Sequence, residues 1–128
     1  MLRKLLEVLN RRTRVAGQNS WQGLKDAFAN EEAFKVQSIL CLFLIPLALT
    51  IAENYIQLLL LLCSLFLVLI VELLNTGIEM VVDRIGTDFH KLSGRAKDIG
   101  SAAVCLSMVL FILVWSMVIA QNTGILDY

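Results

Sequence analysis

The chain has 128 residues and no net formal charge, because eleven Lys and Arg side chains balance eleven Asp and Glu. Its hydrophobic fraction is 58% and its charged fraction only 17%, against about 45–50% and about 25% in soluble chains. A domain of this size has too much surface for its volume to hide that much apolar area from water. The composition excludes a soluble enzyme, a disordered chain and a nucleic-acid-binding module, and it indicates a single membrane domain.

Residues 1–35 are polar to amphipathic, with apolar side chains recurring at helical spacing. A Gly-Gln-Asn-Ser stretch at 17–20 interrupts this pattern, and its serine predicts the N-cap of a second short helix. In that helix Trp21, Leu24 and Phe28 form an apolar stripe. A tryptophan beside basic residues is typical of a helix lying in the membrane interface, and the alternative is a soluble helix packed on other protein. We therefore expect amphipathic, interfacial helices at the N-terminus.

Three uncharged stretches of 17, 17 and 22 residues follow. Seventeen residues make about 25 Å of helix, which is within the range for crossing a bilayer. The second stretch runs on without a helix breaker into a polar segment, and the third opens with small residues that allow close helix approach. We expect an all-α fold with a transmembrane domain at 36–120. Its three spans are 36–52, 55–85 and 99–120.

Polar segments separate and follow the spans. We expect a loop, or a loop with a short helical turn, at 86–97 and a disordered tail at 121–128. Seven of the eleven basic residues lie in 1–35. The other four are Arg84, Lys91, Arg95 and Lys97. Because basic residues favour cytoplasmic segments, we expect the N-terminus and residues 84–98 in the cytoplasm and the C-terminus outside.

Four polar side chains form a stripe on the second span with the spacing i, i+3, i+7 and i+11: Glu72, Asn75, Glu79 and Asp83. At about 100° per residue the stripe is roughly 80° wide. Carboxylates inside or beside a bilayer are costly and by default mark a functional site, whereas the alternative is a set of interhelical pairs. Because no Lys or Arg lies within the membrane part of the spans to form such pairs, the pattern favours function.

The depth of the stripe suggests chemistry at a lipid headgroup. Glu72 lies about 25 Å along the second span, near the cytoplasmic edge of the hydrocarbon, and Glu79 about 10 Å further. The first carboxylate could deprotonate a headgroup hydroxyl, and the second could hold Mg²⁺, which bridges substrate phosphates. Cations able to meet a nucleotide triphosphate stand nearby: Arg12, Lys91, Arg95 and Lys97. No Walker A, GxGxxG or HRD motif is present, so spacing alone does not identify ATP.

Residues 71–104, VELLNTGIEMVVDRIGTDFHKLSGRAKDIGSAAV, closely resemble the signature of the bacterial diacylglycerol kinases, which are small integral-membrane enzymes. The spacing E-x-x-N-x-x-x-E-x-x-x-D-R, with RAKD downstream, is long and specific. Residues 20–34, SWQGLKDAFANEEAF, resemble the family's amphipathic helix. The resemblance extends from about Arg12 to Ala120 and leaves the termini without a motif.

This resemblance implies an N-terminal surface helix, three transmembrane helices, and a homotrimer with active sites between subunits. It implies phosphorylation of diacylglycerol to phosphatidic acid, with ATP as co-substrate and Mg²⁺ as cofactor, at the cytoplasmic face of the bacterial inner membrane. The C-terminus would then be periplasmic. No nucleic acid is expected as a partner.

The resemblance also implies roles for residues at matching positions. Glu72 is expected to be the general base, and Asn75 to orient the base or the substrate. Glu31 and Glu79 are expected to bind Mg²⁺ and so to position ATP. Nucleotide contacts are expected at Arg12, Asn19, Glu31, Glu79, Asp88, Phe89, His90, Lys97 and Asp98. Lipid contacts are expected at Arg12, Trp21, Lys25, Phe28, Ala33, Glu72 and Ser101.

Some of these residues have a plainer interpretation. Glu32 competes with Glu31 as the ligand, Asp83 and Arg84 could form a helix-end pair, and His90 could be a solvated loop side chain. At 35–37 the sequence reads KVQ where the family suggests a more polar run, so lipid contacts there stay open.

Three other functions remain as alternatives. An undecaprenol kinase of the same family would keep the stripe and change the lipid pocket, but SGRAKDIGSAAV resembles the diacylglycerol-specific branch more. A small ion-conducting protein would use Glu72, Glu79 and Asp83 as a relay, and it predicts carboxylates spread across the bilayer rather than gathered at one end. A purely structural subunit would leave the intramembrane glutamate unexplained.

Overall fold

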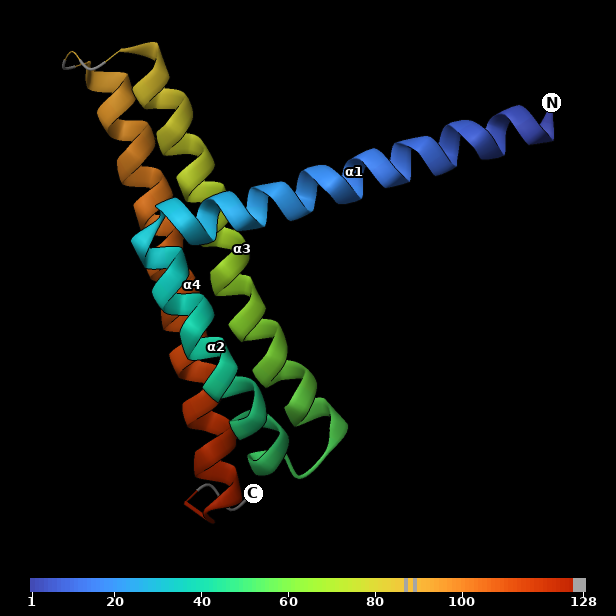
Figure 1. Ribbon diagram of the computed structural model, residues 1–128. Helices are drawn as coiled ribbons and strands as arrows, with labels where there is room; N and C mark the ends of the chain where they lie inside the picture. The colour runs from blue at the N-terminus through green and yellow to red at the C-terminus, as the bar shows by residue number, and fades with distance from the viewer. Residues whose placement is uncertain (87, 89, 126–128) are drawn as a thin grey trace.

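The computed structural model describes residues 1–86, 88 and 90–125. The helices in this part of the chain are α1 (Leu2–Asn30), α2 (Glu32–Ile51), α3 (Tyr55–Ile85) and α4 (Lys91–Asn122). Figure 1 shows α3 and α4 as a long antiparallel hairpin, with α2 beside part of it and α1 projecting away at a steep angle. The fold is all-α, as the sequence predicts.

The helices α2, α3 and α4 are each long and apolar enough to cross a membrane, which agrees with the expectation of three helices able to span it. Many of their large apolar side chains are exposed, including Leu42, Phe43 and Leu106. Water would penalise such a surface, but lipid tails are as apolar as these side chains. A helix also satisfies its own backbone hydrogen bonds, as the hydrocarbon requires.

The polar segment at 86–97, expected as a loop, is mostly helix, because α4 begins at Lys91. His90 caps it, with Nδ1 accepting a hydrogen bond from the backbone N–H of Leu92 at 3.3 Å. The drop in hydropathy marks the end of the apolar stretch and not of the helix, since Lys, Leu, Arg and Ala are all good helix formers. The hairpin of α3 and α4 therefore continues past α2 (Figure 1) and carries polar side chains there.

The helix α1 is continuous, so the prediction of two short helices divided at 17–20 is wrong. Ser20 does not cap a helix; its hydroxyl donates to the carbonyl of Ala16 at 2.9 Å. Such a bond to the carbonyl four residues back accommodates serine inside a helix, and one interior glycine costs only about 1 kcal/mol. The chain turns at Glu31, which has extended backbone angles (φ −106°, ψ 110°) and is the sole residue between α1 and α2.

Amide side chains form hydrogen bonds between the C-terminal ends of α2 and α4 and the N-terminal end of α3. Asn54 caps α3, its Oδ1 accepting from the backbone of residues 56 and 57 at 3.0 Å. Gln57 Nε2 donates to Asn122 Oδ1 at 2.8 Å, and Asn122 Nδ2 donates to the carbonyl of Ile51 at 2.6 Å. Asn122, expected in the tail, is thus the last residue of α4.

The apolar core lies next to these amides and consists of Ala48, Leu61, Trp115 and Val118. The rings of Phe111 and Trp115 are 5.2 Å apart between centroids. The other half of α3 buries polar side chains instead: Glu72, Asn75 and Thr76. This half carries the candidate site.

Candidate active site

Glu72 is buried in the helix bundle, with 7% of its surface exposed. A carboxylate at such a position is costly unless it has a hydrogen-bond partner. Gln37 on α2 supplies one, because its Nε2 donates to Glu72 Oε2 at 3.0 Å. A neutral amide therefore holds the buried acid.

Gln37 is absent from the predicted site. The only signal for it is indirect: it is a polar side chain near the start of the uncharged stretch 36–52, at the KVQ segment where the family pattern is not met. Which polar residue of α2 faces α3 depends on how the two helices pack, and spacing within α2 does not reveal that.

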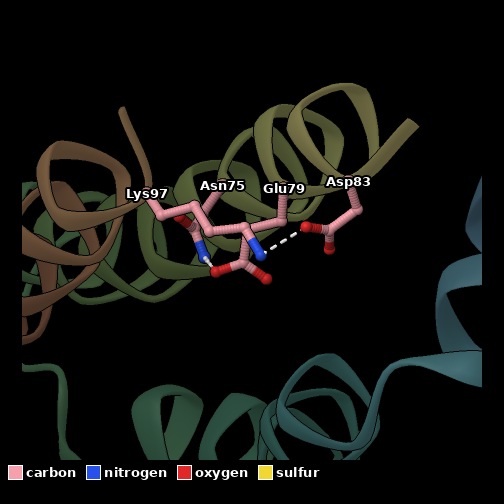
Figure 2. A network of polar contacts seen from close by, with 4 residues as sticks. All are labelled: Asn75, Glu79, Asp83 and Lys97. Carbon is pink, nitrogen blue, oxygen red and sulfur yellow. Dashed lines mark hydrogen bonds and ion pairs between the residues drawn. The ribbon is translucent and has the colours of Figure 1, made fainter. Parts of the chain in front are cut away.

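Asn75 contacts Glu79 rather than Glu72. Its Nδ2 donates to Glu79 Oε1 at 3.2 Å, one turn along the same helix (Figure 2). Its Oδ1 is buried and has no hydrogen-bond partner among the described residues. Opposite lies Gly100 of α4, where an added Cβ would collide with Asn75 Oδ1. The close approach of α4 at this small residue thus fixes the amide that orients Glu79.

Asp83 forms an ion pair with Lys97 of α4, with 2.6 Å between Nζ and Oδ1. The plainer interpretation of Asp83, a helix-end pair with Arg84, is not what the structure shows, because Asp83 pairs with a lysine of another helix. Figure 2 shows the Lys97 side chain extending past Asn75 and Glu79 to reach Asp83. Side-chain exposures of 38% for Lys97 and 61% for Asp83 mean that water screens the pair, so its main effect is to place a cation beside the carboxylates.

Glu31 lies on a different side of α3. It lines a groove of about 470 Å³ between α1 and the face of α3 formed by Leu73, Thr76, Gly77 and Met80. At about 100° per residue, this face is roughly 110° around α3 from Glu79. The two expected Mg²⁺ ligands, Glu31 and Glu79, therefore do not face one another within a single chain. The described residues also contain no cluster of three His, Cys, Asp or Glu able to hold a metal.

The other expected residues are spread over the surface. Arg12 and Asn19 line a shallow hollow on one face of α1. Trp21 is 62% exposed, and Lys25 Nζ lies 5.3 Å from its ring centroid. Phe28, Ala33, Asp88, His90, Asp98 and Ser101 are also exposed. Phe89 lies outside the described residues.

Comparison with known proteins shows extensive similarity. The family model of the prokaryotic diacylglycerol kinases matches residues 18–119. The diacylglycerol kinase of Escherichia coli (strain K12) is 43% identical over 105 residues, which are 82% of this chain and 86% of that protein. The diacylglycerol kinase of Haemophilus influenzae is 50% identical over 96 residues, 75% of this chain and 81% of that protein. That of Pseudomonas aeruginosa is 37% identical over 100 residues, 78% and 81% of the two chains.

Proposed function

Because the chain belongs to the prokaryotic diacylglycerol kinase family, we propose that it transfers the γ-phosphoryl group of ATP to the free hydroxyl of diacylglycerol and so makes phosphatidic acid. The observation that carries this proposal is a buried carboxylate, Glu72, inside a helix that is able to span a membrane. A carboxylate inside the membrane that is paired with a neutral amide is able to accept a proton from a lipid substrate.

Glu72 acts as the general base. It removes the proton from the lipid hydroxyl while that oxygen attacks the γ-phosphorus, the bond between γ-phosphorus and the bridging oxygen breaks, and ADP leaves. Such a transfer depends on positioning and charge neutralisation more than on covalent chemistry by the protein. A soluble kinase motif is therefore not required.

The reaction takes place at the cytoplasmic end of the spans. The basic residues gather in 1–35 and 84–97, which supports a cytoplasmic N-terminus, a periplasmic C-terminus and access of ATP from the cytosol of a bacterium. Nucleotide-binding residues are then Arg12, Asn19, Asp88, Phe89, His90, Lys97 and Asp98. Lipid-contacting residues are Arg12, Trp21, Lys25, Phe28, Ala33 and Ser101.

Glu79 and Glu31 would hold the Mg²⁺ that accompanies ATP. These residues fit Mg²⁺, which needs only one or two carboxylates besides substrate phosphates and water. Asn75 engages just Oε1 of Glu79, which leaves the second oxygen as a ligand. When bound, the ion neutralises charge on the transferring phosphoryl group.

The position of Glu31 supports a site that is shared between subunits. Glu31 lies over the face of α3 that contains Leu73 and Met80, whereas Glu79 lies on the face of Asn75. A neighbouring copy would therefore bring its Glu31 to this chain's Glu79. This supports a ring-shaped homotrimer in which each subunit supplies its Glu31 to the site of the next subunit.

Phosphate transfer from radiolabelled MgATP by the purified protein in mixed micelles tests the proposal. Diacylglycerol and undecaprenol are offered separately, with EDTA as the control, and we expect labelling of diacylglycerol that EDTA abolishes. Labelling mainly of undecaprenol would overturn the substrate while keeping the chemistry. Labelling of neither lipid by a folded preparation would overturn the kinase.

A further inference from the structure

The amide of Gln37 has an orientation that Glu72 dictates. A carboxylate accepts hydrogen bonds and cannot receive one from a carbonyl oxygen, so the amide nitrogen of Gln37 must face Glu72. The distance of 3.0 Å from Nε2 to Oε2 is that of a direct hydrogen bond. The amide oxygen must then point away from the acid.

That amide oxygen accepts no hydrogen bond from the described residues. Gln37 Oε1 is buried and has no hydrogen-bond partner among the described residues. Gln37 also lines a groove of about 250 Å³ between α2, α3 and α4, whose other lining side chains are apolar, among them Leu44, Val68 and Phe111. A glutamine in these surroundings costs stability through its oxygen. Its N–H contact with Glu72 is therefore the interaction that accounts for an amide at this position.

We propose that Gln37 is the positioning residue for the catalytic base. Its N–H donates a hydrogen bond to Glu72 Oε2, which leaves Glu72 Oε1 to take the proton from the lipid hydroxyl. A lysine or arginine in its place would form a strong pair that weakens the base, whereas an amide fixes geometry without a full positive charge.

This inference rests on the proposed role of Glu72 and adds a residue that the family motif does not contain. It predicts a kinetic signature. Because Gln37 acts on the base and not on the nucleotide, Gln37→Leu should lower kcat about tenfold or more while leaving the KM for MgATP unchanged. Leucine fits the apolar groove but leaves Glu72 without this partner, so the variant should fold with a lower unfolding temperature.

The experiment compares Gln37→Leu, Gln37→Glu, Ser38→Ala and Glu72→Gln with the unsubstituted protein in mixed micelles. Gln37→Glu has the same reach and can share a proton with Glu72, so it should recover part of the kcat lost in the leucine variant. Ser38→Ala, a neighbour on α2, should retain full kcat. Thermal unfolding in the same detergent confirms that each variant is folded.

The outcomes separate the two proposals. Activity retained by Glu72→Gln would overturn the base and with it the proposed function. An inactive Glu72→Gln beside a Gln37→Leu with normal kcat would overturn the positioning role alone. Equal losses of kcat in the leucine and glutamate variants would also overturn it, because a hydrogen-bonding side chain of the same reach would then fail to replace Gln37. A change confined to the KM for MgATP would do the same.

Discussion

Gly100 of α4 lies against Asn75 of α3 so closely that any side chain at position 100 would overlap the Asn75 amide oxygen. The contact links helix packing to the site, because the same amide donates to Glu79 at 3.2 Å. The stretch of small residues at the start of the apolar part of α4 therefore does more than bring two helices together. It sets the position of a carboxylate.

Gly100→Ala should displace Asn75 and release Glu79. Overpacking of this kind costs about 1–3 kcal/mol, and we expect a lower unfolding temperature together with a higher Mg²⁺ requirement for activity. Both are measurable by thermal unfolding and by titrating Mg²⁺ in the kinase assay. Gly94→Ala is the matched control on the same helix, because nothing lies within 4 Å of its added Cβ. An equal loss in the two variants would contradict a specific role for Gly100.

Removing the Lys97–Asp83 ion pair should affect nucleotide binding more than stability. Lys97→Met removes the cation proposed to meet the phosphates, so the KM for MgATP should rise severalfold with little change in unfolding temperature. Asp83→Asn frees Lys97 and should leave that KM equal or lower. A rise in KM of the same size in both variants would mean that the pair itself, and not the lysine, serves the nucleotide.

The amide cluster at the other end of the spans should contribute to stability alone. Asn122→Ala removes the donor to the Ile51 carbonyl and the nearer of two acceptors for Gln57 Nε2, the other being Gln121 Oε1. Leaving buried polar groups unpaired costs about 1–3 kcal/mol. We expect a lower unfolding temperature and unchanged kcat per folded molecule, measured by thermal unfolding and by assay at a temperature where the variant is folded. A reduced kcat would show that this end communicates with the site.

Mixing inactive subunits tests the shared site. If Glu31 of one copy completes the site that contains Glu72 of another, trimers assembled from equal amounts of Glu31→Gln and Glu72→Gln chains should regain about one quarter of full activity by random assortment. A mixture of Glu72→Gln and Glu79→Gln should regain none, because both carboxylates belong to the same stripe on α3. Absence of recovery in the first mixture would place each site within one chain.

The sequence predicts the helices better than their ends and joints. The spans follow from hydropathy, and the stripe from Glu72 to Asp83 follows from helical spacing, because both patterns are local. The continuity of α1 through Ser20 and the start of α4 at Lys91 are not visible in those patterns, since a polar segment with good helix formers resembles a loop in hydropathy.

The partners of the stripe depend on packing between helices. Glu72 receives its hydrogen bond from Gln37, 35 residues earlier in the chain, and Asp83 pairs with Lys97 rather than with the adjacent Arg84. Such contacts depend on the rotation and height of one helix against another. Spacing within a single helix contains no information about this rotation or height. The sequence therefore predicts the acidic residues of the candidate site but not their hydrogen-bond and ion-pair partners.

The two tryptophans of the chain occupy opposite environments, and this provides two built-in optical probes. Trp115 is 6% exposed in the apolar core, whereas Trp21 is 62% exposed on α1. Quenchers attached to lipid chains or dissolved in water will reach Trp21 far more readily than Trp115. Substituting either ring by phenylalanine yields a single-tryptophan protein, whose emission then reports the surroundings of α1 or the integrity of the core without an added label.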